Sequence, residues 1–257
     1  MKIAIVGDLH GHINLMYQRL LGLDINMIIQ LGDFLPVRNE GDLKYVPVPT
    51  KYKKVGDFPE YFSGKRRAPI PTLFLSGNHE PFNFINKGFK TVAENIACLG
   101  ACGVRNLLSL SRLAGLTGPI PFESDLTFAW LSGIYSERYF DTPVLEVVTE
   151  ENKKQASYIR AESFYELSTQ LGKRRVDILL MHQPTASFEN YLIQNNGLKE
   201  KDVNFCMGDV LLEQYQSIKT VFVGHTHVFA ETTINNTKHI ALADIQSAQT
   251  NYVILDI

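Results

Sequence analysis

The chain has 257 residues, of which 45% are hydrophobic and 20% charged, and its formal net charge is −2. This composition is typical of a soluble globular protein with a sizeable core and excludes a disordered chain. Because the net charge is close to zero, the chain has no global basic field, and any surface that attracts nucleic acid must be local.

A β-α-β unit is predicted at the start of the chain. Residues 3–6 and 27–31 are short aliphatic runs typical of strands, and residues 13–21 between them carry apolar positions at helical spacing. An apolar run at 72–76 predicts a further strand. Alternating apolar residues also predict strands at 107–110, 113–116 and 126–131. Together these runs indicate an α/β protein with more than one sheet.

The second half continues this pattern. Residues 157–171 have apolar side chains at helical spacing and predict an amphipathic helix with an exposed face. Strands are predicted at 176–181 and 220–223. Antiparallel strands are predicted at the end of the sequence, at 228–234, 239–243 and 251–257, with a turn at Asn235-Asn236.

The three cysteines are too few and too unevenly spaced for a disulfide framework or a zinc knuckle. Cys98 and Cys102 lie four residues apart, and we interpret them as apolar filling on a helix face or in a nearby turn. The chain shows no leader-type apolar region and no apolar run approaching about 18 residues. We therefore expect a soluble, cytoplasmic protein in a reducing compartment. We expect neither membrane association nor an obligate protein partner.

Polar motifs follow the predicted strands directly. In chain order they are Asp8-x-His10, Gly32-Asp33, Gly77-Asn78-His79-Glu80, His182 and Gly224-His225-x-His227. Five of the seven histidines lie within them, which is hard to explain by chance. Open α/β sheets place their sites at the carboxyl ends of strands, so these motifs are expected to meet at one site. Because they span residues 8 to 227, we expect a single domain over residues 1–257.

The residue types predict a site for two divalent metal ions. One ion would take Asp8, His10, Asp33 and His227, and the other Asp33, Asn78, His182 and His225, with Asp33 as the bridge. Mixed oxygen and nitrogen ligands suit Mn, Fe or Zn better than Mg or Ca. Two such ions neutralise phosphate charge and lower the pKa of bound water, producing a hydroxide nucleophile. In an extended chain the i, i+2 pairs Asp8/His10 and His225/His227 would each place both side chains on one side.

His79 follows the predicted ligand Asn78 and is the candidate general acid, because an imidazolium can protonate a leaving alkoxide. For Glu80 two roles stay open, namely orienting His79 or capping the segment that follows.

Each piece taken alone has a simpler interpretation. Asp8 and Asp33 are also the kind of residue that caps a strand end, and His182 could be a hydrogen-bonded core histidine. The motifs as a set favour the metal site. His12 and His239 are better explained as surface or turn residues, although His12 lies close enough to His10 to border the pocket.

A basic and aromatic insert lies at residues 38–67, between Asp33 and Asn78. It carries eight lysines and arginines, with tyrosines and phenylalanines interleaved. Such a stretch is either a solvated surface or a contact for a polyanionic substrate, and both interpretations stay open.

The motifs resemble those of the calcineurin-like metallophosphoesterases, whose pattern is Asp-x-His, Gly-Asp, Gly-Asn-His-Glu or Asp, a lone His, and Gly-His-x-His. Every ligand position of that pattern is filled, and the resemblance covers nearly the whole chain. It implies a four-layer α-β-β-α sandwich of two mixed sheets. The Ser/Thr phosphatase branch fits less well, because Pro36 and Val37 stand where that branch has an acid and an arginine.

Within the superfamily the chain is most similar to the lariat debranching enzymes, which cleave the 2′-5′ phosphodiester of branched RNA. The similarity includes an insert that carries no metal ligand, through Arg38-Asn39-Glu40, Asp42-Leu43, Val48-Pro49, Lys51-Tyr52, Tyr61-Phe62-Ser63-Gly64-Lys65 and Ala68-Pro69. The tentative substrate-binding residues are Arg38, Asn39, His12 and Glu80.

Two departures concern the substrate. Eukaryotic debranching enzymes carry cysteine where this chain has Asp8, so both metal sites are complete here. Residues 84–131, where those enzymes place a lariat-recognition loop, match only in fragments, and an extra hairpin is expected around 111–125.

The resulting expectation is a metal-dependent phosphodiesterase acting on RNA or another nucleotide diester. A phosphomonoesterase for a small metabolite or phosphoprotein is the alternative, because the same metals serve both reactions. A non-catalytic scaffold ranks last, since such proteins usually lose ligands or the acid.

Overall fold

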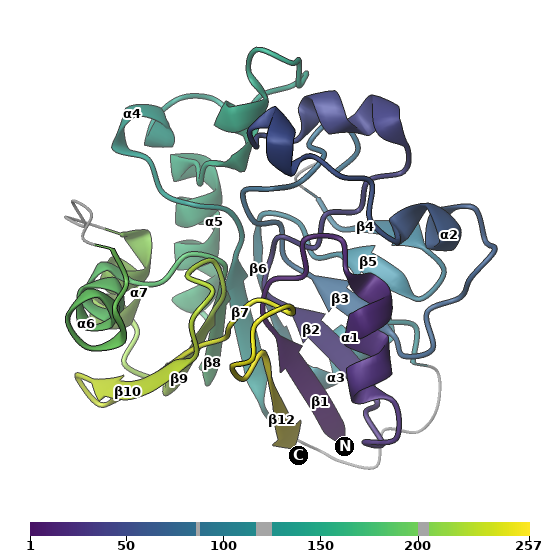
Figure 1. Cartoon of the computed structure of the whole chain (residues 1–257). Coiled ribbons are helices and arrows are strands. Elements are labelled where there is room, and N and C mark those ends of the chain that lie inside the picture. The colour runs from purple at the N-terminus through teal and green to yellow at the C-terminus, as the bar shows by residue number, and fades with distance from the viewer. Residues whose placement is uncertain (86–87, 117–124, 200–205) are drawn as a thin grey trace.

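Two mixed six-stranded sheets form the centre of the structure, a computed structural model that describes residues 1–85, 88–116, 125–199 and 206–257 (Figure 1). The first sheet has the order β12 (Tyr252–Asp256), β1 (Lys2–Val6), β2 (Met27–Gln30), β3 (Thr72–Phe74), β5 (Ile96–Cys98) and β4 (Lys90–Ala93). The second has the order β10 (Ala230–Ile234), β11 (Thr237–Ala241), β9 (Thr220–Val223), β8 (Ile178–Met181), β7 (Thr127–Leu131) and β6 (Cys102–Asn106).

The two sheets share one plan. In each, the four central strands are parallel to one another and each edge strand is antiparallel to its neighbour. The carboxyl ends of the central strands therefore lie at the same end of their sheet, which is where loops converge to form a site.

The sheets pack face to face, and their inner sides form a shared core. In β1, Ile3 and Ile5 face this core while Ala4 and Val6 face the helices outside. Because side chains alternate along a strand and both faces are buried, the strand appears in the sequence as one continuous apolar run.

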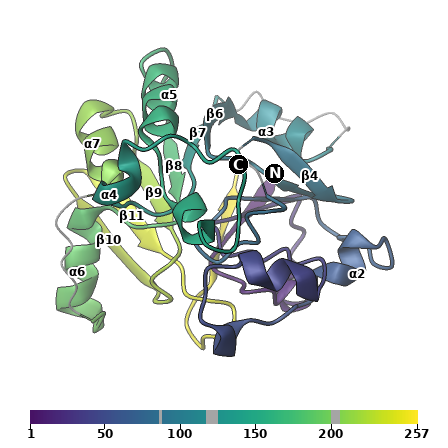
Figure 2. The same ribbon diagram turned by 90° about the horizontal axis from the view of Figure 1, so that it is seen from above.

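Helices cover the outer face of each sheet (Figure 2). α1 (Ile13–Leu20) and α2 (Phe58–Phe62) pack on the first sheet. α5 (Ala161–Leu171), α6 (Ala186–Asn196) and α7 (Met207–Gln214) pack on the second. The layers confirm the predicted four-layer α-β-β-α sandwich.

The remaining elements are short. They are α3 (Leu107–Leu113), α4 (Glu137–Phe140) and the 3₁₀ helices η1 (Glu40–Tyr45), η2 (Thr50–Tyr52) and η3 (Lys153–Ser157). η1 and η2 belong to the insert, and η3 lies beside them because the Lys153 Nζ atom donates to the Lys44 carbonyl at 2.6 Å. The insert therefore contacts the loop region of the second sheet.

The prediction of strands at 107–110 and 113–116 was wrong. Residues 107–113 form α3, which begins after Asn106, whose Oδ1 atom accepts a hydrogen bond from the Ser109 amide at 3.0 Å. This N-terminal cap, with buried Leu107 and Leu110 three residues apart, selects a helix over a strand. Of the expected hairpin at 111–125, residues 111–113 are helical, and 117–124 lie outside the described residues.

One helix boundary and the place of the last strand also differ from the prediction. The helix expected at 157–171 begins at Ala161, because η3 ends at Ser157 and Arg160 has extended backbone. The predicted hairpin at Asn235-Asn236 is present between β10 and β11, with both asparagines at positive φ. The last strand, β12, instead joins the first sheet beside β1, so the strands at the end of the sequence are split between the two sheets.

Cys98 and Cys102 lie on strands rather than on a helix face. Cys98 ends β5, and Cys102 starts β6. Burial raises the pKa of the Cys98 thiol to about 12, so this side chain is a neutral core residue. No helix in the described ranges is both long and apolar enough to cross a membrane.

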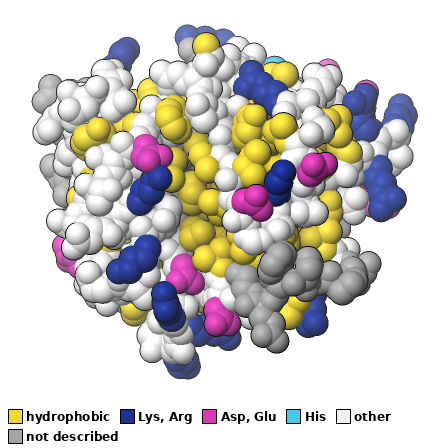
Figure 3. Space-filling view, turned by 90° about the horizontal axis from the view of Figure 1, so that it is seen from below, with side chains coloured by type: hydrophobic (Ala, Val, Ile, Leu, Met, Phe, Trp, Pro, Cys, Tyr) yellow, Lys and Arg dark blue, Asp and Glu magenta, His cyan; other side chains and the backbone are white. Residues whose placement is uncertain are grey.

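At the end of the molecule opposite the loops, the inter-sheet core reaches the surface. Figure 3 shows hydrophobic side chains gathered along the middle of this face. Met1, Leu126 and Ile257 belong to the partly buried residues that pack against this core.

Candidate active site

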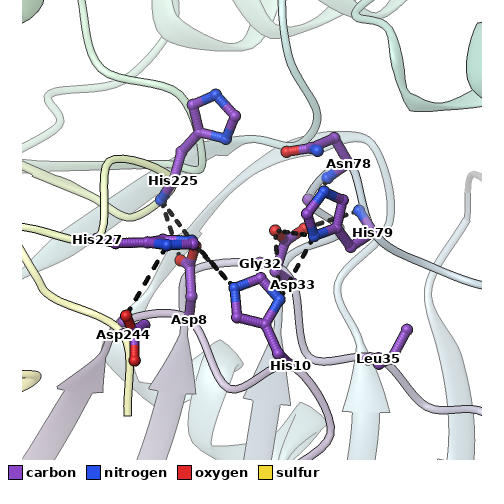
Figure 4. Close-up of polar contacts among 12 residues, drawn as sticks. Asp8, His10, Gly32, Asp33, Leu35, Asn78, His79, His225, His227 and Asp244 are labelled. Carbon is purple, nitrogen blue, oxygen red and sulfur yellow. Dashed lines mark hydrogen bonds and ion pairs between the residues drawn. The ribbon is translucent and has the colours of Figure 1, made fainter. Parts of the chain in front are cut away.

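The predicted ligands lie just after five parallel strands, three from the first sheet and two from the second. Asp8, Asp33 and Asn78 follow β1, β2 and β3, and His182 and His225 follow β8 and β9. The two sheets face each other, so these loops meet, and Figure 4 shows labelled side chains from both sheets close together. Residues more than 200 positions apart thus become neighbours.

One predicted ligand set is brought together as a compact group. Asp8, His10, Asp33 and His227 each offer one ligand atom, and these atoms all lie within 4.8 Å of one another. The His227 Nε2 atom lies 3.1 Å from Asp8 Oδ2 and 3.0 Å from His10 Nε2. A group of two carboxylates and two imidazoles fits a borderline transition-metal ion.

The second set converges around Asn78 and His182. The His182 Nε2 atom lies 3.0 Å from Asn78 Oδ1 and 3.5 Å from Asp33 Oδ1. Its Nδ1 atom lies 2.8 Å from the Leu31 carbonyl, which fixes the ring with Nε2 toward the site. The His225 ring lies edge-on to the His182 ring at 4.9 Å and points away from His227 (Figure 4).

Asp33 has contacts with residues of both sets. Its Oδ1 atom accepts from the amides of Asn78 and His79, each at 2.8 Å. Its Oδ2 atom is buried and, among the described residues, receives no hydrogen bond. A buried carboxylate oxygen that receives no hydrogen bond is costly unless a cation lies close to it, and the ligand atoms around this oxygen fit a bound metal ion.

The electrostatics keep both carboxylates ionised. Burial alone would raise the pKa of Asp8 and Asp33, but the neighbouring histidines, His182 first, outweigh it and hold both pKa values below the ordinary range. Burial lowers the pKa of His10, which favours the neutral ring that a metal ligand requires. A hydrogen bond to Asp8 raises the pKa of His227.

Tight left-handed turns aim these side chains, in place of the extended backbone predicted for the i, i+2 pairs. His10, Asp33, His225 and His227 have φ angles of 46°, 57°, 66° and 59°. Such angles are uncommon for residues other than glycine and cluster at functional sites. This is why His225 and His227 point in different directions.

Two glycines of the motifs are required by the close approach of ligands. A Cβ atom on Gly77 would lie 2.2 Å from Asp33 Oδ1, and one on Gly224 would lie 2.3 Å from Asp8 Oδ1. No side chain fits at these distances, so the pairing of glycine with a ligand in each motif has a steric cause.

His79 lies against Asp33 at the edge of the group. Its Nδ1 atom is 3.2 Å from Asp33 Oδ2 and 3.4 Å from His10 Nδ1, and 30% of its side chain is exposed. It lines a cavity of about 420 Å³ together with His10 and His227. The ring is therefore held by the site and accessible from the cavity.

Glu80 neither orients His79 nor caps the following segment, and it is not placed to bind substrate. It is fully buried, and its carboxylate accepts from the amides of Phe34, Leu35 and Gly77 at 3.0, 2.9 and 3.3 Å. These bonds join the Asp33 loop to the Asn78 loop. Burial and the charge of Asp33 raise the pKa of Glu80 to about 8.

Two supporting residues were not found from the sequence. The buried Gln30 side chain donates from Nε2 to the carbonyls of Gly7 and Gly32, and its Oε1 atom accepts from the Gly32 amide. These hydrogen bonds join the Asp8 loop to the Asp33 loop. Its polar side chain in the otherwise apolar run 27–31 was the available signal. Asp244 Oδ2 lies 3.8 Å from His227 Nδ1, on the far side of the ring from Asp8.

The other candidate substrate residues lie outside the ligand group. Arg38 forms a bidentate pair with Asp42, with Arg38 Nη2 at 2.7 Å from Asp42 Oδ1, and stacks on the Phe84 ring. The Asn39 side chain caps η1 through the Gly41 amide. The His12 Nε2 atom lies 2.7 Å from Lys54 Nζ, a residue that lines the cavity.

His239, predicted at the surface or in a turn, is instead buried on β11. Burial lowers its pKa to about 4, so it is a neutral core residue.

Comparisons with known proteins show what the chain is similar to. The chain is 32% identical to lariat debranching enzyme A of Xenopus laevis over 212 residues, which cover 79% of this chain and 36% of that protein. It is 43% identical to the lariat debranching enzyme of Entamoeba histolytica over 126 residues, covering 45% of this chain and 35% of that protein. The chain thus spans about a third of the length of these relatives.

The fold is similar to that of a solved structure as well. A dimetal phosphatase from Danio rerio superposes with a TM-score of 0.51 at 12% identity, covering 99% of this chain and 91% of that one. The model of the calcineurin-like phosphoesterase family matches residues 1–229, which include every predicted ligand. The chain therefore belongs to the calcineurin-like phosphoesterase family.

Proposed function

We propose that this protein is a metal-dependent phosphodiesterase acting on RNA or another nucleotide diester, in the manner of a lariat debranching enzyme. The observation that carries the proposal is the cavity beside the ligand group. It is lined by His10, His79 and His227 and by an apolar wall of Leu35, Leu43 and Val46, around the start of the insert. A phosphate can reach the ligands while an apolar group attached to it contacts the insert.

The proposed metal ligands are Asp8, His10, Asp33 and His227 for one ion and Asp33, Asn78, His182 and His225 for the other. When bound there, two divalent cations neutralise phosphate charge and lower the pKa of water. The ligand chemistry fits Mn, Fe or Zn.

The chain itself supplies the proton for the leaving group. The His79 Nδ1 atom faces Asp33 Oδ2 at 3.2 Å, which leaves Nε2 for the oxygen of the departing nucleoside. An alkoxide is a poor leaving group, so a proton donor at this position speeds cleavage by about 10²–10⁴-fold. Glu80 and Gln30 hold the three ligand loops in register and are positioning residues.

The diester proposal is favoured over a monoesterase by the insert wall. A phosphomonoester of a small polar metabolite has no group that uses an apolar wall of this size, whereas a nucleoside has a sugar and a base. The named relatives, lariat debranching enzymes, support the same substrate class.

The test compares four substrates with the Mn²⁺-loaded protein: p-nitrophenyl phosphate, bis-p-nitrophenyl phosphate, a linear 3′-5′ oligonucleotide and a 2′-5′ branched oligonucleotide. We expect kcat/KM to be higher for the diesters, and highest for the branched RNA. The His79→Ala variant should lose about 100-fold or more in kcat on the nucleotides. A higher kcat/KM for the monoester, or full activity of His79→Ala, would refute the proposal.

A further inference from the structure

The cavity beside the ligands continues from its apolar wall to a pair of lysines. Lys53 and Lys54 line it together with the insert residues Leu43, Val46 and Val48. Of these three, Val46 is buried, and Leu43 and Val48 pack against the same small apolar cluster. The cavity is thus lined by histidines, by an apolar surface and by cationic side chains.

The two lysines have different surroundings. Lys54 is directed to His12, with its Nζ atom 2.7 Å from His12 Nε2. Lys53 is half-buried and lies beside Lys153, which comes from η3 of the other half of the molecule. Burial and the Lys153 charge together lower the pKa of Lys53.

Lys153 is held in this place by the insert. Its Nζ atom donates to the Lys44 carbonyl at 2.6 Å. The nearby carboxylate, Glu150, pairs with the Lys44 ammonium at 3.4 Å and also attracts Lys53. Lys44, Lys53 and Lys153 thus lie close together, with Glu150 near the first two and Glu151 near Lys153.

Bringing like charges together costs free energy, and a bound anion between them would offset that cost. The position selects the anion. Lys53 lines the same cavity as the ligand histidines His10 and His227, together with apolar residues suited to contact a sugar and a base. Successive phosphates of a nucleic acid are separated by one nucleoside.

We propose that Lys53 and Lys153 bind a non-scissile phosphate of an RNA substrate, one nucleoside away from the bond that is cleaved, with Leu43, Val46 and Val48 holding the intervening nucleoside. This inference rests on the proposed phosphodiesterase function. It makes the enzyme selective for oligonucleotides over isolated diesters, because a single diester lacks the second phosphate.

The first test is binding, which does not depend on catalysis. A fluorescently labelled single-stranded RNA hexamer is titrated by anisotropy, from 50 to 200 mM salt, with wild type and the double variant Lys53→Met, Lys153→Met. The matched control is Lys173→Met, Lys219→Met, which removes the same charge from exposed positions at the opposite end of β8 and β9.

We expect the double variant to bind on the order of tenfold more weakly at 50 mM salt, through the loss of charge-assisted contacts. Loss of one phosphate contact should also reduce the slope of log K against log salt by about 0.7. The control should bind as wild type does. Equal affinities and slopes for wild type and the double variant would overturn the inference, as would an equal loss in the control.

The second test uses kinetics. A dinucleoside monophosphate carries only the scissile phosphate, and the matching trinucleoside diphosphate adds the second one. Wild type should show a lower KM for the longer substrate, and the double variant should lose that difference with kcat little changed. If wild type cleaves no diester at all, the proposed function fails, while the binding experiment still decides the role of the lysines.

Discussion

Replacing Glu80 with alanine should destabilise the protein and loosen its metal site. The carboxylate accepts hydrogen bonds from three buried amides, those of Phe34, Leu35 and Gly77. A buried amide without an acceptor costs about 1–3 kcal/mol, which gives an upper range of about 3–9 kcal/mol for three. Water entering the vacated space recovers part of this, so we expect a loss of about 3–5 kcal/mol.

For a chain of this size the loss corresponds to a fall in Tm of about 6–20 °C. Because Glu80 joins the loops that carry Asp33 and Asn78, Mn²⁺ affinity should also fall about 10–100-fold. Urea unfolding in the presence of a chelator measures the stability, and isothermal titration calorimetry with Mn²⁺ measures the affinity.

Two further variants separate the causes. Glu80→Gln keeps a carbonyl oxygen as an acceptor and is neutral. The raised pKa of about 8 favours the neutral form of Glu80 as well near neutral pH. This variant should therefore lose less stability than Glu80→Ala. Glu213→Ala, an exposed glutamate on α7, should change stability by no more than about 0.5 kcal/mol. If Glu80→Ala lowers the free energy of unfolding by less than about 1 kcal/mol, the hydrogen bonds from the three amides to the Glu80 carboxylate do not stabilise the fold.

Three further predictions follow from the site and the core. Gly77→Ala places a Cβ atom 2.2 Å from Asp33 Oδ1, so metal analysis should find fewer than two ions and diester kcat should fall about 100-fold. The control Gly172→Ala, where the nearest atom to the new Cβ lies at 3.6 Å, should match wild type. His239 has a folded pKa of about 4 against an ordinary 6.5, so the unfolded state takes the proton first and stability falls as pH drops through this window. Wild type should lose about 2–3 kcal/mol more than His239→Leu between about pH 7 and pH 4, and parallel losses would contradict this. Finally, Mn²⁺ at 100 times its Kd should stabilise wild type by about 2.7 kcal/mol and the Asp33→Asn variant by much less. A Tm that is the same with and without a chelator would argue against a native metal site.

The positions of the ligand loops followed from the sequence, because a buried parallel strand appears as a continuous apolar run and a polar motif follows it. The runs before Asp8, Asp33, Asn78, His182 and His225 were each recognisable in this way. Residues 107–113 were predicted as strand because leucines at short spacing fit either period, whereas the Asn106 cap selects a helix.

By itself the sequence determined which chemical groups meet at the loop end of the sheets, since parallel strands bring their carboxyl ends to one edge whatever their order. Only the tertiary structure decided how those groups face one another. The left-handed turns at His10 and His227, the carboxylate of Glu80 across two loops, and the approach of Lys153 to Lys53 depend on contacts between distant segments. Local patterns report burial and backbone period, whereas such contacts are set by sheet order, register and the packing of the two sheets.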